Sequence, residues 1–120
     1  MPLRNGASKF ITHATSLTGT SDTDCYVVPK NFSSHVEHLM IANNDSSNRN
    51  YTLKYYEKST NTTHTLVSTH AVGGSSIESV FTVDKPLFLH AEDKIIVAAA
   101  TGNTLTVVVA AEELFDPAHS

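Results

Sequence analysis

The sequence predicts an all-β protein, a single antiparallel β-sandwich or jelly-roll-like domain of about eight strands. Three observations support this prediction. Apolar residues alternate with polar ones or form short runs, whereas apolar residues at helical spacing are scarce. Turns rich in Gly, Asn, Ser and Thr separate these runs at intervals of roughly ten residues. Charged residues make up only 17% of the chain, and the abundant Ser and Thr favour strands and polar turns over helices.

The expected strands follow one another along the chain with turn-forming residues between them. They are predicted at 9–15, 25–29, 35–44, 51–56, 65–72, 77–83 and 87–89, followed by two strands within 95–110. Pro29 ends the second segment because proline cannot donate to a sheet ladder. The sequences NNDSSNRN and GGSS, which follow the third and fifth segments, consist of turn formers.

The stretch 95–110 is the most apolar part of the chain and is interrupted once, by TGNT. Gly102-Asn103 is typical of a two-residue hairpin turn, and such a hairpin pairs Ala98 with Val107. Both faces of this hairpin are apolar, whereas a sandwich strand normally buries only one. The second face is therefore predicted to be a subunit-contact face, covered either by the N-terminal segment or by another subunit. Its residues are Ile95, Val97, Val108 and Ala110.

The chain is predicted to be one domain with short extensions. Residues 1–20 are expected to form an N-terminal arm or a first strand, 21–116 the β-sandwich, and 117–120 a short tail. The arm is a candidate for reaching a neighbouring molecule, and the alternative is an ordinary ordered strand. Its candidate contact residues are Arg4, Lys9, Phe10 and Ile11.

Composition argues against several classes of protein. The net charge of −4 disfavours a nucleic-acid partner. We expect no membrane partner and no export, because no apolar segment is long enough to span a bilayer and no signal-peptide core is visible. Cys25 is the single cysteine, so no intrachain disulfide can form, and it is expected to be a small buried hydrophobe.

Histidines and acids are the candidates for metal or acid–base chemistry. In HVEH, His35 and Glu37 share one strand face while His38 points away, so three converging ligands are not expected from this segment. A metal site built across strands is the alternative. Asp22 and Asp24 could begin a calcium site, but the later ligands of a calcium loop are missing, which favours a solvated turn. We therefore predict no metal, no cofactor and no catalytic residues.

Aromatic residues show the clearest alternation in the chain. Tyr51, Leu53 and Tyr55 fall on one face, which indicates a half-buried strand whose tyrosines belong to the core. The alternative is an aromatic platform for a sugar, formed by Tyr51, Tyr55, Tyr56 and Phe81. The absence of Trp weakens that alternative.

Three segments in fixed order resemble small β-sandwich virion proteins of tailed bacteriophages. They are a strand ending in VVP, the stretch HLMIANNDSSNRNYTLKYYE, and LFLHAEDKIIVAAATGNTLTVVVAAEE. The resemblance covers residues 25–113. It departs from the family pattern in the turn 91–93, where the family has a glycine before the acid and this chain has Glu92.

The resemblance implies a non-enzymatic structural protein of a virion, assembled in the host cytoplasm. The implied partners are copies of the chain itself, as a trimer or higher ring, and other virion proteins such as the major capsid protein or tail components. The expected role is to decorate or cement the capsid. Alternatives are a neck or tail accessory, a fibre-associated protein, or a glycan-binding module for host-surface recognition. An enzyme is the least favoured hypothesis, because no nucleophile–base pair can be identified.

Overall fold

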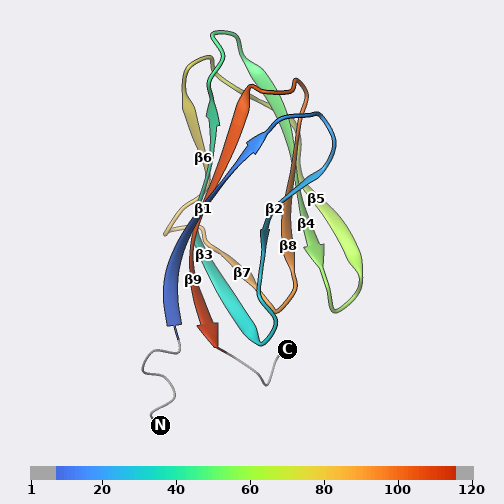
Figure 1. Ribbon diagram of the computed structural model, residues 1–120, viewed down its shortest axis with the longest axis vertical. Helices are drawn as coiled ribbons and strands as arrows, with labels where there is room; N and C mark the ends of the chain where they lie inside the picture. Colours follow the sequence, from blue (N-terminus) through green and yellow to red (C-terminus); the bar gives the residue numbers. More distant parts are fainter. Residues whose placement is uncertain (1–7, 116–120) are drawn as a thin grey trace.

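A computed structural model describes residues 8–115 (Figure 1). Its strands lie where apolar and polar residues alternate or where short apolar runs occur in the sequence. This part of the chain has no helix long and apolar enough to cross a membrane. The all-β prediction is confirmed, and each predicted segment overlaps an observed strand. The strands are β1 (Ser8–Leu17), β2 (Thr23–Val27), β3 (Phe32–Asn43), β4 (Arg49–Glu57), β5 (Thr62–Val72), β6 (Ile77–Phe81), β7 (Leu87–Leu89), β8 (Lys94–Ala99) and β9 (Leu105–Phe115).

Two antiparallel sheets pack face to face. Sheet A has the order β1-β9-β3-β6, with β7 also pairing with β3. Sheet B has the order β2-β8-β4-β5. Figure 1 shows the first strand, β1, lying beside β9 near the other end of the chain. The predicted β-sandwich is therefore confirmed.

The core lies between the sheets and is built by the period-two alternation of the central strands. On β9, Leu105, Val107 and Val109 are buried, and on β8, Ile95 and Val97 are buried. Each fully buried aliphatic side chain of this kind stabilises the fold by about 1.5–3 kcal/mol. The predicted core strand at 51–56 is also confirmed, since Tyr51 and Leu53 of β4 are fully buried.

The predicted hairpin at 95–110 is wrong, because β8 and β9 belong to different sheets. The loop around Gly102-Asn103 crosses from sheet B to sheet A instead of reversing within one sheet. A Cβ at Gly102 would lie 2.6 Å from the Thr18 carbonyl oxygen, so this crossing needs glycine. Asn103 adopts a φ of 62°, a left-handed conformation that Asn tolerates, and its N–H donates to the Leu17 carbonyl at 2.9 Å.

The four residues of the predicted contact face are consequently separated. Ile95 and Val97 point into the core and are 1% and 0% exposed. Val108 and Ala110 are half-buried and lie on the solvent side of sheet A. The four residues therefore do not form one contact face. Only Val108 and Ala110 lie on the outward side of a sheet.

The N-terminal segment contains a strand of the same sandwich. Within 1–20, β1 pairs with β9 along its whole length, and Ile11 packs partly against the core. Lys9 and Phe10 are exposed on this strand. Arg4 and the expected tail 117–120 lie outside the described residues.

Candidate functional site on the outer face of sheet A

Sheet A turns one face to the core and the other to solvent, and we call the second the outer face of sheet A. On β9, Val109 is buried, whereas Val108 and Ala110 point outward. Paired residues of neighbouring strands point to the same side of a sheet, so the partners of Val108 also lie outward. They are Ala14 on β1 and Met40 on β3, which makes this part of the outer face apolar.

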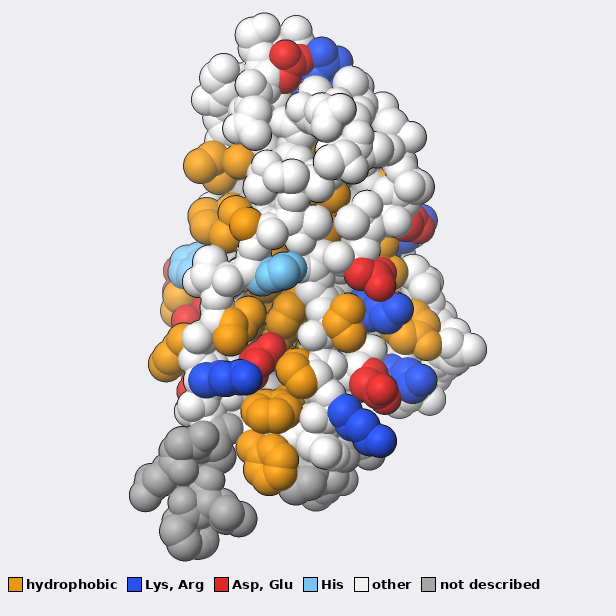
Figure 2. Space-filling view, in the orientation of Figure 1, with side chains coloured by type: hydrophobic (Ala, Val, Ile, Leu, Met, Phe, Trp, Pro, Cys, Tyr) orange, Lys and Arg blue, Asp and Glu red, His pale blue; other side chains and the backbone are white. Residues whose placement is uncertain are grey.

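Large apolar side chains stand exposed on this outer face. Phe10 is 71% exposed and Phe88 is 65% exposed. The register connects them in one row across four strands, because Phe10 pairs with Glu112, Glu112 with His35, and His35 with Phe88. Figure 2 shows hydrophobic side chains over the middle and lower parts of the molecule, whereas its upper loops are mostly polar. Exposed aromatic side chains at both ends of this row make the outer face of sheet A a candidate interaction surface.

A cluster of one histidine and two carboxylates lies in the middle of that row. One ligand atom each of His35, Glu37 and Glu112 lies within 4.8 Å of the others. The sequence pattern of β3 identified His35 and Glu37 but missed Glu112, which comes from β9. Only the cross-strand register brings Glu112 opposite His35, and no signal within HVEH could have predicted that.

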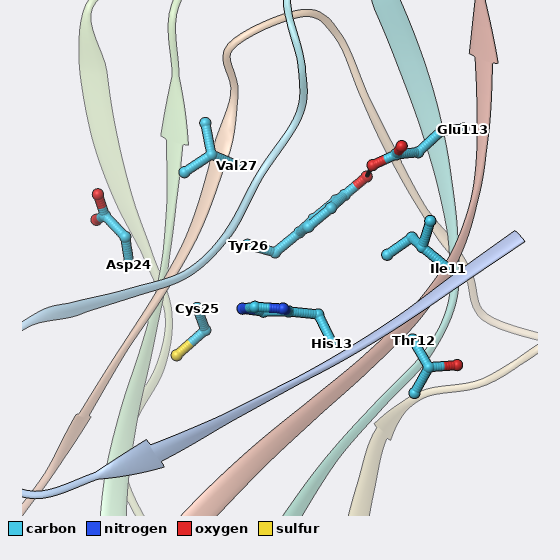
Figure 3. Close-up of a pocket in the computed structure, with 8 residues that line it drawn as sticks. All are labelled: Ile11, Thr12, His13, Asp24, Cys25, Tyr26, Val27 and Glu113. Carbon is cyan, nitrogen blue, oxygen red and sulfur yellow. Dashed lines mark hydrogen bonds between the residues drawn. The ribbon is translucent and has the colours of Figure 1, made fainter. Parts of the chain in front are cut away.

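Away from the outer face of sheet A, a hollow of about 420 Å³ opens between the edge strands β1 and β2 (Figure 3). Ile11 and His13 project into it from β1, whereas Thr12 points away. The Tyr26 ring crosses the gap and donates its hydroxyl hydrogen to Glu113 at 2.6 Å. This hollow is therefore partly filled by a polar bridge between the two sheets.

The bridge holds a buried carboxylate in place. Glu113 is only 4% exposed, and its second oxygen lies 3.7 Å from Nζ of Lys9. The Ser34 hydroxyl lies 2.8 Å from the Tyr26 hydroxyl oxygen. Burial, followed by the hydrogen bond to Glu113, raises the pKa of Tyr26, so the phenol stays a neutral donor at neutral pH. We interpret this network as structural, because a buried acceptor needs partners.

Cys25 lines the same hollow but is not a reactive thiol. It is 1% exposed, and burial raises the pKa of its thiol to about 11. The thiolate, which is the nucleophilic form, is therefore scarce at neutral pH. The predicted buried, apolar role of Cys25 agrees with this environment.

Two further sequence candidates occupy other places. Asp22 and Asp24 do not converge on one point, since each carboxylate pairs with its own lysine: Asp22 with Lys54 at 2.9 Å and Asp24 with Lys94 at 3.2 Å. The solvated interpretation is thus supported over a calcium loop.

The proposed aromatic platform is not assembled. Tyr51 is buried, and its hydroxyl donates to Glu78. Tyr55 packs against the core from sheet B, and Phe81 does so from sheet A. Tyr56 instead donates its hydroxyl hydrogen to the Asn61 side chain at the surface. The four aromatic residues therefore do not share one surface.

The turn before β8 holds one residue in a strained backbone conformation. Glu92 has a φ of 67°, the left-handed region in which glycine is favoured. Asp93 is 1% exposed and accepts hydrogen bonds from the backbone N–H groups of Lys58 and His90, at 2.9 and 2.8 Å. Its role is to anchor the turn.

The comparisons with known proteins concern the fold. No protein-family model and no curated protein matches the chain. Among solved structures it is similar to a chain of Bacillus endospore appendages, a family of disulfide-linked pili. The identity is 9% and the TM-score 0.54, and the alignment covers 91% of this chain and 87% of that one. This likeness supports the β-sandwich.

Two structures of Clostridium thermocellum xylanase 10B have lower TM-scores. One contains a family 22 carbohydrate-binding module and a catalytic module, with 8% identity and a TM-score of 0.39; it is aligned over 89% of this chain and 24% of that one. The other is the C-terminal family 22 carbohydrate-binding module, with 10% identity, a TM-score of 0.38 and coverage of 92% and 86%.

Proposed function

We propose that this protein is a non-enzymatic structural subunit that assembles with copies of itself through the outer face of sheet A. The observation that carries the proposal is a set of apolar side chains on this face: the exposed Phe10 and Phe88, which flank Glu112 and His35, and the half-buried Val108 and Ala110. Within the described residues 8–115, β3 and β9 carry no Lys or Arg, so the centre of this face lacks the long basic side chains that cover apolar residues elsewhere.

The free edge of β1 adds a second reason. β1 is ten residues long and, over the part of the chain that the structure describes, pairs only with β9. An edge strand of this length presents unpaired backbone groups that can receive a strand of another chain. Phe10 lies on the same strand, so edge pairing and apolar contact can occur together.

The pilus-like neighbour supports an assembling role through its fold only. That neighbour belongs to disulfide-linked pili. In this chain, Cys25 is the only cysteine and is buried, so we propose non-covalent contacts between subunits in place of disulfides.

The virion setting rests on the sequence resemblance alone. We propose a tailed-phage particle as the location, with decoration or bracing of the capsid as the role and the major capsid protein or tail components as further partners. Mass spectrometry of purified particles tests this setting, because a virion subunit is expected at a fixed copy number per particle. Absence of the chain from particles would exclude the setting while leaving self-assembly open.

Self-assembly is tested by light scattering on Val108→Asp, with Ile96→Asp as the matched control. Both substitutions place a carboxylate on the outward side of a central strand, one in each sheet. We expect the wild type to be an oligomer of the 13.0 kDa chain, Val108→Asp to be a folded monomer, and Ile96→Asp to keep the wild-type mass. A wild type that stays monomeric at all concentrations, or equal dissociation in both variants, would refute the proposal.

A glycan-binding module is the competing function. Tyr51, Tyr55, Tyr56 and Phe81 do not form a platform, and the carbohydrate-module likeness has a TM-score below 0.5. Glycan-array binding that is lost on Tyr56→Ala would favour this alternative over assembly.

A further inference from the structure

We propose that His35, Glu37 and Glu112 form a binding site for one transition-metal dication of the zinc type. All three side chains lie on the outer face of sheet A, and one ligand atom of each is within 4.8 Å of the others. Donors on a tetrahedral ion with metal–ligand distances of about 2.0–2.2 Å lie about 3.4 Å apart. The two glutamates have rotatable stems, and small rotations close the remaining gap.

The backbone brings the three residues together by two separate devices. His35 and Glu112 are direct register partners on adjacent strands, so their side chains emerge side by side. The register between β3 and β9 shifts between Val36 and His38, which places Glu37 in a bulge. Alternation puts Glu37 on the outward side with His35, and the bulge turns His38, the register partner of the outward Ala110, to that side as well, so the expectation that His38 points away was wrong.

The imidazole ring of His35 is held in place by stacking, and its hydrogen-bonding capacity is not fully used. His35 stacks on Phe88, with ring centroids 4.6 Å apart and an interplanar angle of 23°. Its Nε2 atom is buried and has no hydrogen-bond partner among residues 8–115. Its Nδ1 atom lies 4.0 Å from Oε2 of Glu37, too far for a hydrogen bond. A metal ion bound by this ring would use a nitrogen that the protein alone leaves without a short contact.

The charge of the cluster favours a cation. Over the described part of the chain, neither Glu37 nor Glu112 forms an ion pair with a lysine or arginine, and the nearby Lys9 pairs with Glu113 instead. Two carboxylates therefore lie beside one imidazole with no lysine or arginine from the described residues paired to them. Like charges at such separations repel, and a dication removes the repulsion.

The ligand set identifies the class of ion. Imidazole suits Zn²⁺, Co²⁺ and Ni²⁺, whereas Mg²⁺ and Ca²⁺ prefer oxygen ligands alone. Three protein ligands leave at least one position open to solvent. A hollow of about 360 Å³, lined in part by His35, Phe88 and Glu112, gives access to the cluster. All three ligands come from one chain, so binding needs no second chain, although the site lies on the face that is also proposed for self-assembly.

The test is calorimetric titration of tag-free full-length protein with ZnCl₂, together with the absorption spectrum of the Co²⁺ form. We expect saturable binding of one ion per chain that Ca²⁺ does not displace. Loss of a supporting residue around a metal site typically weakens binding about 10–100-fold, and loss of a ligand in Glu112→Gln is expected to do at least as much. The isosteric amide keeps the size of the side chain, and the far-ultraviolet dichroism should not change.

The matched control is His38→Gln, which removes a histidine beside the cluster but not from it. We expect less than about a threefold change in affinity for this control. The ring protons of His35 should also be the most strongly shifted histidine signals on Co²⁺ addition, a readout that needs no variant. No saturable binding up to about 1 mM Zn²⁺, equal losses in His38→Gln and Glu112→Gln, or shifts centred on other histidines would overturn the proposal.

Discussion

Strands β8 and β9 are neighbours in sequence, similarly apolar and each central in its sheet, yet their outward sides have opposite surroundings. On β8, the half-buried Ile96 has Asp24 and Lys54 as its register partners. Both partners belong to ion pairs, Lys54 with Asp22 at 2.9 Å and Asp24 with Lys94 at 3.2 Å. Long charged side chains can bury their stems over an apolar neighbour, so Ile96 needs no external cover.

On β9, the corresponding half-buried residue has apolar partners instead of charged ones. Val108 has Ala14 and Met40 as register partners, and Phe10 and Phe88 are exposed farther along the same face. The difference between the two strands therefore comes from their neighbours and not from their own sequences. An apolar outward residue indicates a contact site only when the adjacent strands leave it bare.

The largest expected effect on the free energy of unfolding comes from placing a charge on the inner side of β8 instead of its outer side. Val97→Asp places a carboxylate at a position that is 0% exposed, and we expect a loss of at least about 4 kcal/mol in the free energy of unfolding. The adjacent Ile96→Asp is expected to lose less than about 2 kcal/mol, because its side chain reaches water. Urea unfolding followed by circular dichroism measures both. Similar losses in the two variants would contradict the assignment of Val97 to the core.

An intermediate effect on the free energy of unfolding is expected at alkaline pH. It comes from Cys25 on β2, the strand that pairs with β8. Burial raises the pKa of Cys25 from 9.0 to about 11. Between these values the unfolded chain releases the thiol proton while the folded chain retains it. The stabilisation is therefore fully present below pH 9 and is lost as the pH rises, at about 1.4 kcal/mol per pH unit.

Urea midpoints between pH 8.5 and 10 measure this dependence. In Cys25→Ser, whose hydroxyl does not titrate in this range, the decline should be shallower. Buried tyrosines contribute at higher pH, since burial and the nearby Asp93 raise the pKa of Tyr55 to about 12. An identical decline in wild type and Cys25→Ser would contradict the role of the thiol.

The smallest expected effect on the free energy of unfolding comes from glycine substitutions in the two turns that flank β8. Glu92 and Asn103 both have positive φ, 67° and 62°, but only Asn is well suited to that conformation. We expect Glu92→Gly to raise the free energy of unfolding by about 1 kcal/mol and Asn103→Gly to change it by a few tenths at most. Thermal unfolding distinguishes the two. A lower melting temperature for Glu92→Gly would show that the Glu92 side chain contributes more than its backbone conformation costs.

The sequence predicted the strands and the fold class because alternation and turn residues are local signals. Tyr51 and Leu53 were assigned to the core by their spacing alone, and Cys25 by its apolar neighbours. The pairing of β8 with β9 was wrong because Gly102-Asn103 fits both a hairpin turn and a crossing between sheets. That choice depends on which strands compete for each edge, and no local signal carries it.

The candidate site was only half predictable for the same reason. His35 and Glu37 lie two residues apart in the sequence, whereas Glu112 joins them only through the β3–β9 register. The exposed row has the same origin, since Phe10, Glu112, His35 and Phe88 come from four strands. Val108 and Ala110 do lie on the outward side of β9, but Ile95 and Val97 were mistakenly grouped with them.

The position of β9 between β1 and β3 also affects the order in which the chain can fold during synthesis. Until residues 105–115 leave the ribosome, β1 has no sheet partner and one side of β3 stays open. Pairings between segments so distant in sequence form slowly and leave exposed strand edges in the meantime. A chain that ends before Leu105 would leave the β9-facing edges of β1 and β3 unpaired. Synthesis of β9 is therefore the step that protects the nascent sheet A from pairing with other chains.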